Sequence, residues 1–169
     1  MKRMIALAFF LVSFSIAGVA IEAATDGSVD LKNDWPAISL NERTVRELLD
    51  NKADVYLIDF WASWCEPCLE SLPFYMSELK KMNLTNWTLV AVNVDAEKSA
   101  ALDFLKKIQL PTWVLFDEKR KLANKMNVTS IPVLYFVNRK GEILKIEKGF
   151  TKKSKEIFRK NVEAVKSML

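Results

Sequence analysis

The chain of 169 residues has no histidine and only two cysteines, and these scarcities exclude several classes of function. Histidine is the usual general base and the commonest zinc ligand, so its absence argues against serine-triad hydrolysis and His-based zinc chemistry. The excess of positive charge is also small, because 25 Lys and Arg face 21 Asp and Glu, and Lys2 and Arg3 supply two of the four net positive charges. We therefore predict neither a nucleic-acid partner nor a metal site.

An apolar stretch follows the basic start of the chain and predicts export. It covers residues 4–21 and precedes Glu22. We interpret residues 1–22 as a signal peptide or, since the stretch reaches the lower length limit for a membrane span, as an uncleaved anchor. Residues 23–34 are small and polar and predict a linker to a folded domain over 35–169. The expected location is periplasmic or extracytoplasmic, either soluble after cleavage or anchored by residues 4–21.

Buried strands and amphipathic helices alternate along this domain. Apolar runs predict strands over 55–60, 87–94, 112–116, 133–137 and 143–146, the last two forming a hairpin. Apolar stripes predict helices over 41–51, 67–79, 99–108, 119–126 and 152–169. The stripes place Leu69 of the second helix, and Ile157, Phe158, Val162, Val165 and Leu169 of the last, on buried sides. The alternation predicts an α/β fold with a central mixed sheet, mainly parallel with an antiparallel hairpin edge, flanked by helices.

The two cysteines, Cys65 and Cys68, lie between the end of a predicted strand and the first turn of a predicted helix. Unpaired backbone N–H groups and the helix dipole stabilise an anion there, so Cys65 should ionise readily and act as the attacking sulfur. Cys68, one helical turn further, should be more buried and within reach of Cys65. Pro67 suits the first helical turn. Such a pair exchanges disulfides without any cofactor.

Other interpretations of the cysteine pair remain. A structural disulfide closing so short a loop would remove little chain entropy. A zinc site would need carboxylates to complete its ligands, because the chain has no further cysteine and no histidine. The two residues could also be unrelated thiols.

A longer segment around the cysteines carries a family resemblance. The segment reads Asp59-Phe60-Trp61-Ala62-Ser63-Trp64-Cys65-Glu66-Pro67-Cys68 and is followed by Pro73, and further along come Ile131-Pro132, Gly141 and Gly149. Over residues 35–169 this resembles the thioredoxin superfamily, which implies a thioredoxin-like fold. An extra helix and strand between Asp95 and Ile131 resemble the insertion of the TlpA/ResA/DsbE branch, whose members are exported and usually reducing.

The resemblance implies roles for residues around the pair. Pro132 would be cis, and the backbone of Ile131 would pair with an extended client segment. A trans proline that merely begins a strand is the alternative. Asp59 would relay the proton of the buried thiol, because burial raises the pKa of a carboxyl group. The alternative for Asp59 is a solvated acid at the end of a strand.

Further residues are assigned by the same resemblance. Glu66 would tune the reduction potential through its charge, and Trp64 would provide an apolar contact for clients, beside Pro67. Thioredoxin pairs its buried acid with a lysine, but the aligned residue here is Ala91, so proton handling must differ. The extra acid that some members place near the site would be Glu97 or Glu118.

The function implied is that of a protein-disulfide reductase acting through Cys65 and Cys68. Its clients would be exported proteins with disulfides, apocytochrome c among the candidates in cytochrome c maturation, and a membrane thiol donor would return it to the reduced state. Two alternatives remain: an oxidase or isomerase of opposite redox poise, and a peptide-binding module whose cysteines are idle.

Overall fold

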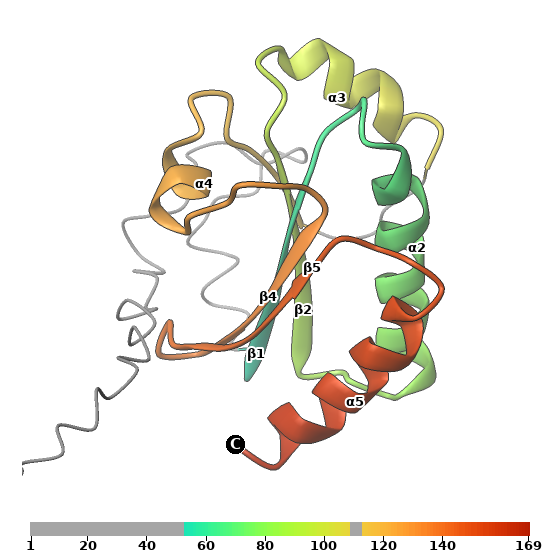
Figure 1. Cartoon of the computed structure of the whole chain (residues 1–169), viewed down its shortest axis with the longest axis vertical. Helices are drawn as coiled ribbons and strands as arrows, with labels where there is room; N and C mark the ends of the chain where they lie inside the picture. The colour runs from blue at the N-terminus through green and yellow to red at the C-terminus, as the bar shows by residue number, and fades with distance from the viewer. Residues whose placement is uncertain (1–52, 109–112) are drawn as a thin grey trace, which may run out of the picture.

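The computed structural model describes residues 53–108 and 113–169 as one five-stranded sheet with helices against it (Figure 1). The predicted signal peptide, linker and helix over 41–51 lie outside these residues. Within them, no helix combines the length and apolar character that a membrane crossing requires.

The sheet has the strand order β3-β2-β1-β4-β5. Its strands are β1 (Val55–Trp61), β2 (Trp87–Asn93), β3 (Trp113–Phe116), β4 (Val133–Asn138) and β5 (Ile143–Lys148). β1, β2 and β3 run parallel, whereas β4 is antiparallel to β1, and β5 to β4. Every residue of β1 is buried, as expected for a central strand covered on both faces. The predicted mixed sheet with an antiparallel hairpin edge is confirmed.

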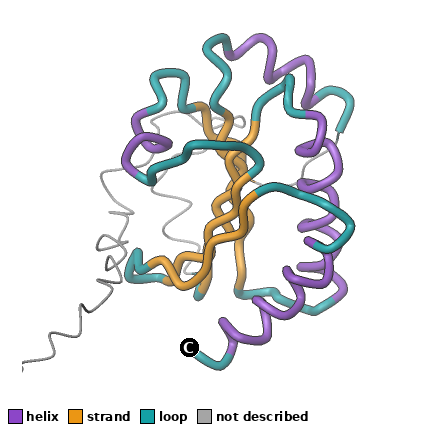
Figure 2. Tube along the Cα trace, in the orientation of Figure 1, coloured by secondary structure: helices purple, strands orange, loops and turns teal. Residues whose placement is uncertain are grey.

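The helices are α2 (Glu66–Lys81), α3 (Lys98–Leu105), α4 (Lys121–Lys125) and α5 (Ser154–Lys166). The chain steps from β1 to β2 to β3 in one direction, so right-handed crossovers place α2 and α3 on the same side of the sheet. The step from β3 back to β4 reverses direction and places α4 on the other side. Figure 2 shows the strands as a central orange layer, with α2 and α5 on one side and α4 on the other.

An aromatic cluster joins α2 and α5 to the sheet. Tyr75 of α2 lies 5.1 Å from Phe158 of α5, and Phe158 lies 5.8 Å from Phe136 of β4, between ring centroids. On the same face of the sheet Trp61 stacks on Phe104 of α3 at 4.7 Å. Burying rings of this size stabilises the fold by about 1.5–3 kcal/mol each, so these contacts hold α2, α3 and α5 against the sheet.

Three apolar residues predicted to be buried are exposed. Leu69, Ile157 and Leu169 have exposed fractions of 41%, 47% and 61%. Leu69 follows the buried Cys68 and so points about 100° away from it, Ile157 borders the stripe made by Phe158 and Val162, and Leu169 lies beyond the end of α5. The described elements between Asp95 and Ile131 are α3, β3 and α4, and their status as an insertion relative to thioredoxin stays a prediction.

Candidate active site

The cysteine pair forms a disulfide at the start of α2. Cys65 is the N-cap residue of the helix and has an extended backbone, and Pro67 lies in the first turn. The N–H group of Cys68 donates to the carbonyl of Cys65 at 3.0 Å, which closes that turn. Cys65 is 4% exposed and Cys68 is fully buried. The predicted junction of strand and helix is confirmed, with the sulfur nearer to solvent on the residue that opens the helix.

Asp95, just beyond β2, holds the loop that leads to Cys65. Its carboxyl group accepts hydrogen bonds from the backbone N–H of Ser63 at 2.9 Å and the Ser63 hydroxyl at 3.1 Å. The side-chain amide of Asn93 donates to it at 2.8 Å. Asp95 is 5% exposed, so these bonds lie in a dry environment that strengthens them. Sequence reasoning did not predict these hydrogen bonds. The only feature in the sequence that indicates them is the pair of polar residues Asn93 and Asp95 at the end of a buried strand.

Replacing Asp95 by alanine should lower the free energy of unfolding by about 2–4 kcal/mol, because three donors lose a charged or polar acceptor in a buried place. Urea denaturation of the disulfide form measures the change. The matched control is Asp103→Ala, which removes a solvent-exposed ion pair with Lys106 and should leave the free energy of unfolding almost unchanged. Equal effects of the two substitutions would show that Asp95 does not brace the loop.

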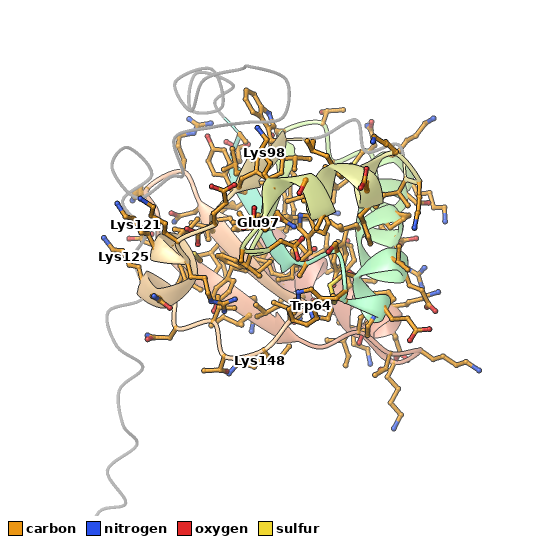
Figure 3. The ribbon with its side chains drawn as sticks, turned by 90° about the horizontal axis from the view of Figure 1, so that it is seen from above. Trp64, Glu97, Lys98, Lys121, Lys125 and Lys148 are labelled. Atoms are coloured by element: carbon orange, nitrogen blue, oxygen red, sulfur yellow. A yellow bond between two sulfur atoms is a disulfide. The ribbon has the colours of Figure 1, made fainter. Side chains whose placement is uncertain are left out.

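Trp64 projects into solvent directly before Cys65. Its exposed fraction is 70%, the largest among the exposed large apolar side chains of the described residues. Glu66 and Pro67, after Cys65, are exposed as well. Figure 3 looks onto this end of the molecule and shows Trp64 in the same view as Glu97 and Lys148. The surface around the pair thus offers an aromatic ring to a partner molecule.

The Ile131–Pro132 peptide bond is cis, as predicted, so the trans alternative is wrong. Phe60 pairs with Val133, and the register therefore brings Pro132 opposite Trp61 at the end of β1 that leads to Cys65. The carbonyl of Pro132 accepts a hydrogen bond from the N–H of Gly149 at 2.8 Å, where Gly149 has a φ of +72°. The cis-proline loop and the disulfide consequently lie at the same end of the sheet.

Asp59 is fully buried inside β1, so the solvated alternative is wrong. It lies opposite Ala91 of β2, the residue predicted to occupy the position where thioredoxin has its lysine. Neither carboxyl oxygen of Asp59 has a hydrogen-bond partner among the described residues. Burial, and then the negative charge of Glu147, raise the pKa of Asp59 well above its usual range. Such a carboxyl group stays protonated at pH values where an exposed one is ionised.

Glu147 of β5 is a buried acid whose charge acts on Asp59 and which sequence reasoning missed. It is 7% exposed, and burial raises its pKa to about 7 while a hydrogen bond from Asn161 opposes the increase. Glu97 and Glu118, the two candidates for an extra acid near the cysteine pair, are both exposed, and that role stays a prediction. Glu147 lies on β5, two residues before Gly149. No group of three His, Cys, Asp or Glu side chains suited to a metal occurs within 53–108 and 113–169.

Together the sheet order, the cis-proline and the cysteine pair at a helix start define a thioredoxin-like protein. The chain belongs to the Redoxin family, whose profile matches residues 31–165. This finding confirms the predicted resemblance.

Several individual proteins similar to this chain are named as thiol-disulfide oxidoreductases or interchange proteins. The thiol-disulfide oxidoreductase ResA of Bacillus subtilis is 30% identical over 103 residues, which cover 61% of this chain and 58% of ResA. The sporulation thiol-disulfide oxidoreductase A of the same organism is 33% identical, with coverage of 60% and 63%. These matches thus span less than two thirds of the relatives' length. A solved structure of a thiol:disulfide interchange protein DsbE from Chlorobium tepidum has a TM-score of 0.64 and 32% identity, covering 69% of this chain and 83% of that one.

Proposed function

We propose that this protein is an extracytoplasmic thiol–disulfide oxidoreductase that reduces disulfides in exported client proteins. The observation that carries the proposal is the Cys65–Cys68 disulfide at the opening of α2, beside the exposed Trp64 and at the same end of the sheet as the cis Ile131–Pro132 bond. Relatives named thiol-disulfide oxidoreductases support it. Export rests on the apolar residues 4–21.

The reaction is two consecutive thiol–disulfide exchanges. The Cys65 thiolate of the reduced protein attacks one sulfur of the client disulfide, that S–S bond breaks, and the client keeps one thiolate while a mixed disulfide forms. Cys68 then loses its proton and attacks the Cys65 sulfur, which releases the second client thiolate and forms the Cys65–Cys68 bond. The client gains two electrons and the protein loses two electrons. The protein also gives up the one proton of Cys68, because Cys65 starts as a thiolate, and the two client thiolates take up their protons from that proton and from water.

Asp59 is proposed to accept the proton of Cys68 in the second exchange. Cys68, Leu72 and Tyr75 form the buried side of α2, which packs on the sheet face that carries Asp59. A carboxyl group with a raised pKa is a stronger base when ionised and so removes a thiol proton more readily.

Clients are proposed to bind across the end of the sheet near the disulfide. The backbone of Ile131 would pair with an extended client segment as an added strand, while Trp64 covers its apolar side chains. Glu66 and Pro67 would contact the same segment, and the charge of Glu66 would oppose formation of the Cys65 thiolate. Apocytochrome c is one exported client of suitable chemistry.

The cycle needs no bound cofactor and ends with an oxidised protein. A membrane protein with a reactive dithiol is proposed to reduce it again, by the same exchange chemistry in reverse.

The reduction potential tests the proposal. Equilibrating the protein with dithiothreitol or glutathione mixtures and trapping free thiols should give a potential near that of thioredoxin, about −270 mV. A potential near about −120 mV would instead identify an oxidase. Reduction of a model substrate such as insulin by the wild type, but equally by Cys65→Ser and Cys68→Ser variants, would favour a binding module with idle cysteines.

A further inference from the structure

The single buried residue of the edge strand β5 is an acid. Glu147 is buried, whereas Ile146 before it is 47% exposed and Lys148 after it is exposed. Burying a carboxyl group is costly unless it is neutral or well paired. Here one oxygen of Glu147 accepts a hydrogen bond from the Asn161 amide of α5 at 2.8 Å, and the other has no partner among the described residues. A buried, half-satisfied acid next to an exposed isoleucine calls for a reason other than packing.

Glu147 shares its side of the sheet with Asp59. Asp59 lies opposite Leu134 of β4, and Leu134 lies opposite Glu147, so the three side chains form one row across the sheet. Residues directly opposite one another project from the same face, and strands are about 4.8 Å apart, so two strand spacings separate the acids, on the order of 10 Å. Leu134 between them is fully buried, which keeps their surroundings apolar.

The polar and charged groups next to Asp59 and Glu147 include no cation paired with either acid among the described residues, so the charge of one acid affects the pKa of the other. Burial, and then the charges of Asp59 and Glu147, raise the pKa of Tyr75 of α2, so its hydroxyl interacts electrostatically with both acids. From α5, Asn161 donates to Glu147, while Arg159 pairs with Glu78 of α2 at 2.7 Å and 3.1 Å. The charge of Glu147 contributes to the raised pKa of Asp59.

We infer that Glu147 is a second proton-binding residue of the redox centre, a positioning residue that acts through Asp59 and sets the pH at which Asp59 can take the proton of Cys68. This inference rests on the proposed function. When Cys68 attacks the mixed disulfide, its proton passes to the Asp59 carboxylate, the Cys65–Cys68 bond forms and the client sulfur leaves with the electron pair. Ionised Glu147 makes Asp59 hold that proton more tightly, so removal of the charge weakens Asp59 as a base.

The test follows the second exchange alone. Reduced protein reacts with Ellman's reagent in two phases: attack by Cys65 depends on reagent concentration, and attack by Cys68 on the resulting mixed disulfide does not. The pH midpoint of the second phase is measured in the wild type, Glu147→Gln, Asp59→Asn and the double variant. Glu147→Gln should lower the midpoint by roughly one unit, a tenfold change in proton affinity, and should have no effect on the midpoint in the Asp59→Asn background.

Two further variants keep the test decisive. Asn161→Ala removes a hydrogen bond that lowers the pKa of Glu147, so Glu147 binds its proton more strongly and the midpoint should move in the same direction as with Glu147→Gln. Glu163→Gln, an exposed acid of α5 paired with Lys166, should leave the midpoint unchanged.

An unchanged midpoint in both Glu147→Gln and Asn161→Ala would overturn the inference. Glu147 would then only discourage strand pairing at the sheet edge, a role that alters aggregation but no pH profile. If the wild type has no concentration-independent second phase, the proposed function itself fails, and this outcome is distinct from an unchanged midpoint.

Discussion

Replacing Cys68 by serine should leave client proteins attached to Cys65 as stable mixed disulfides. Cys65 opens α2, where we expect unpaired backbone N–H groups to stabilise its thiolate, and it is the less buried of the two cysteines. Without Cys68 the second exchange has no nucleophile, so the adduct persists. Turnover with a disulfide substrate should fall by roughly 1,000-fold or more in both Cys65→Ser and Cys68→Ser, because the two sulfurs act as a unit.

Adducts separate the roles of the two cysteines. The Cys68→Ser variant, exposed to oxidised extracytoplasmic proteins and analysed by non-reducing gels and mass spectrometry, should carry clients on Cys65. The Cys65→Ser variant should carry few, because its remaining thiol is fully buried in the oxidised fold, and the double variant is the background control. Equal labelling of Cys65→Ser and Cys68→Ser would reverse or abolish the assigned order of attack.

Much of this site could be predicted from local sequence. A continuous apolar run identifies β1, and the cysteines directly after it fall at the start of α2. The cis state of Pro132, which the family resemblance implies, agrees with expectation, and so does the burial of Asp59, which lies inside a central strand. These features depend on short stretches of sequence in which no bulge or long-range contact changes the pattern of buried residues.

Glu147 could not be predicted in this way, since a bulge in the hairpin breaks the alternation of β5. Val137 pairs with Ile143 and Phe136 with Lys145, so Leu144 is an extra residue and the following side chains exchange faces. Ile146 is consequently half exposed, and Glu147 joins the face covered by α2 and α5. The burial of Glu78 could not be predicted from local sequence either, because Glu78 forms a salt bridge with Arg159, 81 residues away in sequence.

The buried acids should also make the fold less stable as pH rises. The pKa of Glu147 is raised to about 7 from a reference of 4.5, and the pKa of Asp59 is raised well above 3.8, so the folded protein binds protons more strongly than the unfolded chain. Stability is then greatest below the reference values and falls as pH increases from about 4.5 to about 7 and beyond. For Glu147 alone the loss is on the order of 3 kcal/mol, at 1.36 kcal/mol per pKa unit.

Urea denaturation of the oxidised protein between pH 4 and pH 8 measures this dependence. The Asp59→Asn/Glu147→Gln variant should be more stable than the wild type at pH 8, with the difference shrinking toward pH 4, where both acids are protonated in the fold and partly protonated in the unfolded chain. The Arg159 pair lowers the pKa of Glu78, so its contribution has the opposite sign and is lost only as pH falls below the usual carboxyl range. Glu78→Gln therefore serves as the control, because it leaves the decline between pH 5 and pH 8 in place. If the double variant declines as steeply as the wild type over that range, the fold does not raise the pKa of Asp59 or Glu147, and the Asp59 carboxylate would be too weak a base to take the proton of Cys68 in the redox cycle.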